Sequence, residues 1–278
     1  MVNFNGTLVL QTADSLSENR GFLFGDAVFE TFKIVDSRVL FLEDHYFRLM
    51  SAMRILRMDI PMTFTMEFIE QQILELVQAN GLETSARVRM TVFRNSGGFY
   101  LPQDNDVSYL IQCSALKSKH YLLNLEAYEV DLFKDFYVTK QLLSTIKSTN
   151  KAIQITGSIF ASENGFQNCL LLNDSKNVIE ALNGNLFMLK NGKLSTPPVS
   201  EGCLNGIMRK QILALSKSMD VEVAEEPISP FDLQKADELF ITNVINGVQP
   251  ITKYRKKEFD TNFASQFIQQ INKQFILI

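Results

Sequence analysis

The sequence predicts a protein of the mixed α/β (α+β) class that folds into two domains. First, a chain of 278 residues, 46% of them hydrophobic and 21% charged, can bury more than one substantial core. Second, strand-type alternation and helix-type spacing of apolar residues both occur in each half of the chain. Third, residues 114–121 form a polar stretch that is typical of a connector. We therefore expect an N-terminal α/β domain over residues 1–116 and a C-terminal domain over residues 117–278 that carries Lys147.

The N-terminal half alternates between the two periods. Apolar residues recur every three or four positions over residues 42–58 and 65–80, which predicts two helices. Strands are expected at residues 28–34, 87–94 and 107–113. Within the second of these strands, alternate residues fall on opposite faces of the sheet. One face carries Val88, Met90 and Val92, and the other carries Arg87, Arg89 and Thr91.

The C-terminal half carries more strands. Asn191-Gly192 marks a hairpin turn, and a glycine loop that begins at Gly202 leads into a helix ending near Met219. The other expected elements are strands at 122–130, 134–140, 168–172, 178–181, 185–189, 239–242 and 247–254, and helices at 148–162 and 263–275. Free N–H groups at the start of the helix after Gly202 could receive a phosphate.

Composition excludes several classes of function. The net charge of −4 offers no basic field for nucleic acid. No run of 18 apolar residues predicts a membrane span, and the N-terminus lacks the pattern of a secretion signal. The three scattered cysteines, Cys113, Cys169 and Cys203, fit no disulfide framework, and with two histidines in the chain we expect no metal site. We expect a soluble, cytoplasmic protein.

Lys147 is the candidate nucleophile. It stands between apolar Ile146 and the small hydroxyl residues Ser148 and Thr149, with no carboxylate nearby in the sequence. A lysine that is buried in such a setting can lose its charge, and a neutral amine is the nucleophile that Schiff-base chemistry needs. Charge statistics alone favour an exposed lysine near a helix start.

Arg48 is a candidate anion-binding residue. It lies three residues after His45 on the expected helix, so the two side chains are neighbours on one face. A surface pair is the simpler interpretation. The alternative is that Arg48 points into a site, where its planar fork suits a phosphate. Glu30, a carboxylate in apolar surroundings, is equally open between a solvent-facing position on its strand and a functional one.

The order of these segments resembles the fold-type IV pyridoxal-phosphate enzymes, which include branched-chain and D-amino-acid aminotransferases and aminodeoxychorismate lyase. Phe24-Gly-Asp-Ala-Val-Phe-Glu-Thr31 is similar to the family's Phe-Gly-Asp-Gly-Val-Phe-Glu segment, with Ala27 where glycine is usual. Leu42-Glu-Asp-His-Tyr-Phe-Arg-Leu49 is similar to its helix with the phosphate-binding arginine. The resemblance covers nearly the whole chain. It implies the two-domain, D-amino-acid-aminotransferase-like fold, pyridoxal 5′-phosphate as cofactor and a homodimer.

The resemblance also implies a set of site residues. Lys147 would bind the cofactor aldehyde and move the substrate proton, Arg48 would bind the phosphate, and Glu180 would face the pyridine nitrogen. The turn before the helix that follows Gly202 would hold the phosphate through backbone N–H groups, and the last strand segment would approach it. The residues implied at these two places are Ile207, Met208, Asn243 and Val244.

Within the family, the motifs favour aminodeoxychorismate lyase, which forms 4-aminobenzoate and releases pyruvate. Gly206-Ile-Met-Arg209 and Phe29-Glu-Thr31 resemble that branch. The second arginine that lyases often carry after their arginine strand is missing after Gly98. A branched-chain or D-amino-acid aminotransferase is the alternative, and a non-catalytic dimeric binding module is a second one.

The substrate is expected to be a small amine, and several residues are candidates for holding its carboxylate. Thr31, Arg89 and Arg94 are predicted to contact the substrate. Arg87 is a further alternative. Base rates for arginine place two of the three arginines 87, 89 and 94 at the surface.

Overall fold

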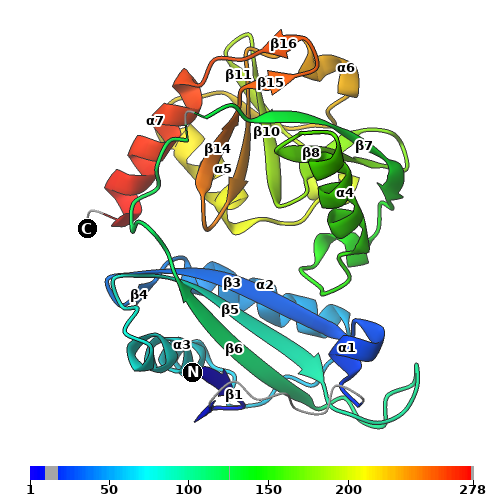
Figure 1. Cartoon of the computed structure of the whole chain (residues 1–278), viewed down its shortest axis with the longest axis vertical. Coiled ribbons are helices and arrows are strands. Elements are labelled where there is room, and N and C mark those ends of the chain that lie inside the picture. The colour runs from blue at the N-terminus through cyan, green and yellow to red at the C-terminus, as the bar shows by residue number, and fades with distance from the viewer. Residues whose placement is uncertain (10–17, 125, 277–278) are drawn as a thin grey trace. The chain divides into compact units, whose positions relative to one another are not determined.

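The computed structural model describes residues 1–9, 18–124 and 126–276, and the chain divides into two compact units (Figure 1). The first unit comprises residues 1–119 together with residues 146–150, and the second comprises residues 120–145 and 151–278. The expected placement of Lys147 in the C-terminal domain is therefore wrong: its short segment belongs to the first unit, from which it is separated in sequence. Among the described residues, no helix is long and apolar enough to cross a membrane.

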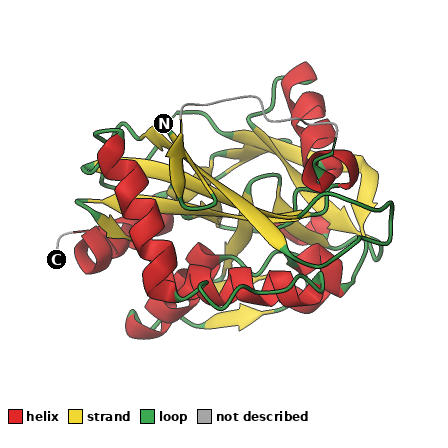
Figure 2. Ribbon diagram, turned by 90° about the horizontal axis from the view of Figure 1, so that it is seen from below, coloured by secondary structure: helices red, strands yellow, loops and turns green. Residues whose placement is uncertain are grey.

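The first unit is built on a six-stranded antiparallel sheet with the order β2-β1-β6-β5-β3-β4. Three helices, α1, α2 and α3, complete the unit, and Figures 1 and 2 show helices lying along one side of its sheet. The strands are β1 (Val2–Phe4), β2 (Thr7–Val9), β3 (Ala27–Val35), β4 (Arg38–Val39), β5 (Ser85–Arg94) and β6 (Val107–Ala115), and the helices are α1 (Arg20–Phe24), α2 (Leu42–Ile55) and α3 (Met66–Ala79).

Alternation along β3 and β5 separates an apolar face from a polar one. Phe32, Val88 and Met90 are buried on the face that packs against apolar residues of α2 and α3, such as Met53 and Ile73. The predicted alternation of β5 is therefore confirmed. The opposite face carries Thr31, Lys33, Arg87, Arg89 and Thr91, because successive residues of a strand point to opposite sides. Glu30 and Arg94 are the charged residues that fall on the helix-covered face.

Two predicted helix bounds are wrong for local reasons. The helix expected over 42–58 ends at Ile55, because Arg57 takes a left-handed backbone conformation with φ of 56°. The helix expected from residue 148 starts at Ala152. Residues before it are extended, since the N–H of Thr149 donates to the carbonyl of Ala27 in β3 at 3.0 Å.

The second unit holds a ten-stranded sheet of mixed direction, in which β13 and β14 pair beside β10. A single strand, β7, replaces the two strands expected at 122–130 and 134–140, and its register with β8 shifts between Phe133 and Val138. The strands are β7 (Glu129–Val138), β8 (Asn168–Asn173), β9 (Val178–Ala181), β10 (Gly184–Lys190), β11 (Lys193–Thr196), β12 (Val223–Glu225), β13 (Glu238–Asn243), β14 (Gly247–Ile251), β15 (Lys253–Tyr254) and β16 (Lys257–Glu258).

Helices flank this sheet and close its core. The helices are α4 (Ala152–Glu163), α5 (Ile207–Ser218), α6 (Pro230–Leu233) and α7 (Asn262–Ile271), with short 3-10 turns at Leu142–Thr145 and Val199–Glu201 and a π turn at Asn272–Ile276. The predicted helices after Gly202 and near the C-terminus are confirmed. The predicted site residues of this unit lie at the N-terminus of α5, on β9, at the end of β13 and directly after it.

Candidate active site

Lys147 is fixed by pairing with the first strand of its unit. Its carbonyl accepts a hydrogen bond from the N–H of Phe29 at 2.8 Å, and Ser148 bridges to Val28. The half-buried side chain brings the Lys147 Nζ to 4.6 Å from the centroid of the Phe29 ring. The lysine therefore lies at the edge of β3, on the polar face of the sheet with Phe29.

Arg48 lies on the helix-covered face and is joined to a buried carboxylate. Its Nε and Nη2 donate to the two oxygens of Glu30 at 2.7 and 2.6 Å, and His45 Nδ1 is 2.7 Å from the same carboxylate. Burial by itself would raise the pKa of Glu30, but Arg48 and His45 outweigh it and lower that pKa to about 2. Glu30 is thus buried, and the interpretation of Arg48 and His45 as a surface pair is wrong.

His45 links Arg48 electrostatically with Lys147. Its ring is fully buried, and its Nε2 has no hydrogen-bond partner among the described residues. Burial lowers the pKa of His45, the Glu30 carboxylate opposes that shift, and the charges of Arg48 and Lys147 lower it further. Because both cations act on one imidazole, the structure brings Arg48 and Lys147 into the same region of the first unit.

The polar face of the sheet carries a row of cations. Thr31 pairs with Arg89 across β3 and β5, and Lys33 pairs with Arg87. The Arg89 guanidinium carbon lies 3.7 Å from the Phe29 centroid, so one ring faces both Arg89 and Lys147. Lys33 is buried, which lowers its pKa to about 8.

The guanidinium of Arg94 is fully engaged in hydrogen bonds within the first unit. Its Nε donates to Asp26 at 2.9 Å, and its other nitrogens donate to the carbonyls of Leu56 and Arg57 and to the Asn105 side chain. We expected two of the three strand arginines to be exposed at the surface. That prediction is wrong, since Arg94 is buried and both Arg87 and Arg89 are half-buried. Arg94 ties three loops together.

In the second unit, Glu180 is a buried carboxylate near the glycine loop. Its Oε2 accepts a hydrogen bond from the N–H of Leu204 at 2.9 Å. Asn185 on β10 pairs with Glu180 on one side and with Thr242 of β13 on the other. The Asn185 side chain donates to the Leu204 carbonyl at 2.8 Å, so Leu204 is held from both of its polar groups.

The N-terminus of α5 lies against the same asparagine. Gly206 is the N-cap and provides no side-chain oxygen for the first-turn amides, which include those of Ile207 and Met208. A Cβ on Gly206 would collide with the Asn185 side chain, so a larger residue there would displace the asparagine that holds Leu204. A bare helix N-terminus of this kind suits an anion.

Asn243 is the last residue of β13, and Val244 begins the turn that follows it. The Asn243 side chain accepts from the N–H groups of Ile245 and Asn246, and the Val244 carbonyl accepts from Tyr121 at 2.8 Å. The side chain of Asn243 is therefore engaged in its own turn. The hydroxyl of neighbouring Thr242 is buried without a partner among the described residues. Thr242 was not among the predicted site residues, although it directly precedes Asn243, which was.

Each unit taken by itself offers groups that suit one part of a pyridoxal phosphate. The first unit carries an amine, Lys147, and a guanidinium, Arg48. The second carries a buried carboxylate, Glu180, which suits a protonated pyridine nitrogen, and the uncapped amides of α5, which suit a phosphate. The residues present thus fit the cofactor. Among the described residues, no group of three or more His, Cys, Asp or Glu could hold a metal ion.

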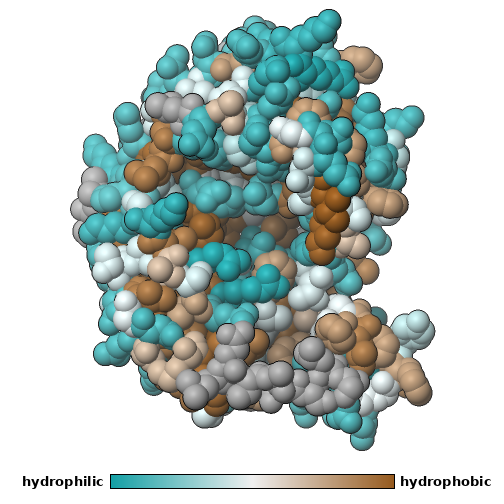
Figure 3. Space-filling view, viewed as in Figure 1, coloured by the Kyte–Doolittle hydropathy of each residue, from teal (hydrophilic) through white to brown (hydrophobic). Residues whose placement is uncertain are grey.

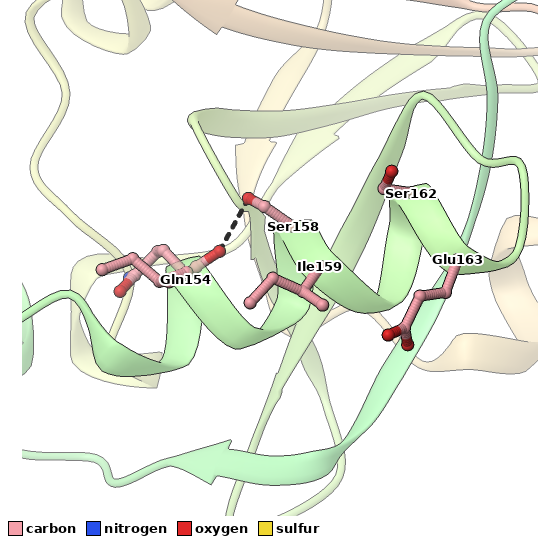
Figure 4. A pocket seen from close by; sticks show the side chains of 6 residues that line it. Gln154, Ser158, Ile159, Ser162 and Glu163 are labelled. Atoms are coloured by element: carbon pink, nitrogen blue, oxygen red, sulfur yellow. Dashed lines mark hydrogen bonds between the residues drawn. The ribbon is translucent and has the colours of Figure 1, made fainter.

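A shallow depression on α4 has a different character. Figure 4 shows Ile159 between polar side chains of the helix, and the Ser158 hydroxyl donates to the carbonyl of Gln154 at 2.7 Å. Ile155 and Ile159 are exposed, and Figure 3 shows apolar surface over this helix. Glu163 is its one charged lining residue, and no histidine, lysine or arginine lines the depression to activate the hydroxyls of Ser158 and Ser162.

Comparison with known proteins decides the family. The profile of the family described as amino-transferase class IV matches residues 27–254. The chain belongs to amino-transferase class IV. Enzymes of this class depend on pyridoxal phosphate and include transaminases and lyases, which confirms the predicted enzyme class and cofactor.

The class IV relatives carry different names. A putative branched-chain-amino-acid aminotransferase of Methanocaldococcus jannaschii is 30% identical over 92% of this chain and 88% of its own length. A D-alanine aminotransferase of Staphylococcus haemolyticus is 22% identical over 99% of this chain and 96% of its own. The predicted reaction is therefore confirmed only at the level of the class.

Solved structures confirm the predicted fold. The Escherichia coli branched-chain amino acid aminotransferase matches with a TM-score of 0.88 at 22% identity, covering 99% of this chain and 94% of its own. The 4-amino-4-deoxychorismate lyase of Pseudomonas aeruginosa matches with a TM-score of 0.84 at 21% identity, covering 99% of both chains. At this identity the likeness establishes a fold that lyase and transaminase share.

Proposed function

We propose that this chain is an enzyme whose substrate is an amine with two carboxylates. Lys147 would bind pyridoxal phosphate and then move the substrate proton. When bound, the cofactor withdraws electrons from the carbon next to the substrate amine, which makes its proton acidic. Lys147 Nζ takes that proton as general base. The half-buried setting of Lys147 beside Phe29 limits hydration of the amine.

Other residues would hold the cofactor in place. Glu180 keeps a proton on the pyridine nitrogen, because an ionised carboxylate favours a facing cation. The amides of Ile207 and Met208 and the backbone at Asn243 and Val244 bind the phosphate. Arg48 adds a guanidinium, whose charge is largely balanced by Glu30. The amides of α5 therefore supply an important share of the phosphate binding.

The observation that carries the substrate proposal is the cationic face of the first sheet. Arg89 is half-buried and stacks on Phe29, and its Nε donates to the neutral hydroxyl of Thr91 at 3.1 Å. A half-buried guanidinium without a facing carboxylate favours a bound anion. Arg89 with Thr31 would hold a substrate carboxylate, and Arg94, which is occupied by Asp26, is a weaker candidate.

The leading reaction is that of 4-amino-4-deoxychorismate lyase. Lys147 removes the proton from the ring carbon that bears the amine, and the bond from the ring to the enolpyruvyl oxygen breaks. The ring becomes aromatic as 4-aminobenzoate, and the departing enol takes a proton to become pyruvate. The substrate has two carboxylates, which agrees with the cationic face. The lyase-like segments Phe29-Glu-Thr31 and Gly206-Ile-Met-Arg209 support the same choice.

A transaminase is the second candidate, and it is favoured by the relative that is 30% identical and is named a putative branched-chain aminotransferase. Glutamate, a common amino donor, would also present a second carboxylate to Arg89. A non-catalytic dimeric binding module on the same fold is the third candidate. In each case we propose a cytoplasmic homodimer that binds neither nucleic acid nor a membrane.

The deciding experiment offers the purified protein single substrates. Release of pyruvate from aminodeoxychorismate without an added keto acid supports the lyase. Ping-pong exchange between an amino acid and a keto acid, with no pyruvate from aminodeoxychorismate, supports the transaminase. Absence of the near-ultraviolet to blue absorbance of a lysine-bound cofactor after addition of pyridoxal phosphate supports the binding module.

The role of Glu180 has a separate test. Glu180→Gln keeps a hydrogen-bond acceptor for the Leu204 N–H but removes the charge, so the cofactor should stay bound while turnover falls by roughly tenfold or more. Absorbance titration and steady-state kinetics measure the two effects. Unchanged turnover would mean that another group faces the pyridine nitrogen.

A further inference from the structure

Three cations share one face of the first sheet, away from the helices. Lys33 of β3 and Arg87 of β5 are direct cross-strand partners, and Arg89 lies two residues along the same strand. Direct partners in an antiparallel pair point to the same side, as do residues i and i+2 of a strand. Lys33, Arg87 and Arg89 therefore form one row, which begins near Phe29 and runs away from it.

The two arginines of this row have no carboxylate partner among the described residues. Arg87 makes no ion pair or side-chain hydrogen bond there, and Arg89 contacts the neutral groups of Thr91 and Phe29. Both side chains are half-buried. Burial lowers the pKa of Arg89, and the neighbouring charge of Arg87 lowers it further. Two like charges held together in a partly dry setting disfavour each other, and an anion would relieve that repulsion.

The positions in the row set an order of distance from the reactive amine. Lys147 Nζ and the Arg89 guanidinium lie 4.6 and 3.7 Å from the same Phe29 centroid, so their separation cannot exceed the sum of these distances. Arg87 lies one step further along β5, roughly 7 Å beyond Arg89 for two residues of a strand. An anion held by Arg87 is thus the more distant of two anions on this face.

We propose that Arg87 and Lys33 form a second anion subsite, which selects amine substrates that carry two carboxylates. This proposal rests on the proposed function, in which the substrate amine reacts at Lys147. Arg89 and Thr31 hold the carboxylate nearer to the amine, and Arg87 with Lys33 holds the distal one. Residue spacing places the two carboxylates roughly 5–8 Å apart. An aliphatic side chain at the distal position would leave the half-buried Arg87 without an anion and is disfavoured.

The subsite can be tested by binding of two simple probes to the holoenzyme. Benzene-1,3-dicarboxylate and benzoate share a ring and differ by one carboxylate, and calorimetry at fixed ionic strength measures both. Wild type should prefer the dicarboxylate by about tenfold or more. Arg87→Gln should lose most of that preference while its benzoate affinity stays within about twofold. Lys33→Met, which replaces a buried cation with an apolar chain of similar shape, should reduce the preference by about threefold or more.

Controls separate this inference from the proposed function. Arg54 is exposed on α2, and Arg54→Gln should retain the full preference. A wild type without dicarboxylate preference, or an Arg87→Gln variant that retains the preference or weakens both probes equally, overturns the subsite. The same preparations are checked for cofactor absorbance and for a borohydride-reduced adduct on Lys147. A missing adduct defeats the proposed function, whereas a normal adduct without dicarboxylate preference defeats the subsite alone.

Discussion

The two faces of the first sheet handle charge in opposite ways. On the helix-covered face, Arg48 is matched by Glu30 at 2.6 Å, with His45 on the same carboxylate. On the polar face, Arg87 and Arg89 have no carboxylate partner among the described residues. A buried charge that is paired within the chain contributes to the fold, whereas a half-buried charge left unpaired is a cost that a ligand can offset. We therefore expect the first set to contribute mainly to the stability of the fold, and we propose the second set for binding the substrate.

Lys147 gives the largest expected effect. It lies beside Phe29 on the polar face, so Lys147→Ala should abolish cofactor absorbance and reduce turnover by about a thousandfold or more, with little loss of stability. Spectra, steady-state kinetics and urea unfolding of the apoprotein measure the three quantities. Lys151→Ala, four residues away, is the control and should keep its activity. An adduct that maps to Lys140 or Lys151 would contradict the assignment.

Some parts of this comparison could be predicted from the sequence, because they follow from local pattern. Alternation alone placed Arg87 and Arg89 on one face of β5, away from Val88. Resemblance in short motifs indicated Lys147 and Arg48 as site residues. The helix after Gly202 was predicted from the glycines and the apolar spacing that follows them.

Other parts depend on contacts between residues that are distant in sequence. Glu30 is buried because α2 packs its His45 and Arg48 against β3, and base rates for charged residues favour the surface. The extended Lys147 segment exists because β3 offers an unpaired edge at Ala27 and Phe29. The local sequence favours a helix start at residue 148. Pairing with β3 instead keeps the segment extended, and the helix begins at Ala152.

Breaking the paired charge should give the next largest effect. Arg48→Met leaves Glu30 buried without its main partner, which should cost about 3–5 kcal/mol of the free energy of unfolding. The double variant Arg48→Met with Glu30→Gln removes both charges and should recover most of that loss. Urea unfolding of the apoproteins measures both.

The same pair of variants separates structure from phosphate binding. If Arg48 also contacts the cofactor, the double variant should regain stability but still bind pyridoxal phosphate more weakly than wild type. Equilibrium titration of the cofactor measures this difference. Wild-type affinity in the stable double variant would remove Arg48 from the phosphate site, and an unaltered stability of Arg48→Met would contradict the paired-charge account.

Acid should destabilise the protein through Glu30 and His45, which lie on the helix-covered face of the first sheet. The pKa of Glu30 is lowered from 4.5 to about 2, so its contribution to stability is present above pH 4.5 and is lost as the pH falls toward 2. The pKa of His45 lies below its usual 6.5, so the folded state also loses stability as the pH falls below 6.5. Unfolding measured from pH 7 to 3 should show a shallower loss in Glu30→Gln than in wild type. Parallel curves for the two proteins would place the acid sensitivity elsewhere.

The smallest expected effect is a change of stability in alkali through Lys33, which lies on the polar face of the first sheet. The pKa of Lys33 is lowered by burial from 10.5 to about 8, so the folded state releases its proton more readily than the unfolded chain does. The stability contributed by Lys33 should therefore rise between pH 8 and 10.5, because the unfolded chain still binds a proton there that the folded state has released. Lys33→Met removes the titrating group, and its stability relative to wild type should fall across that range. Lys134→Met, at an exposed strand position, should show no such change. If wild type and Lys33→Met keep a constant difference from pH 8 to 10.5, the lysine titrates as it does in water, and the distinction between the two faces would rest on the arginines alone.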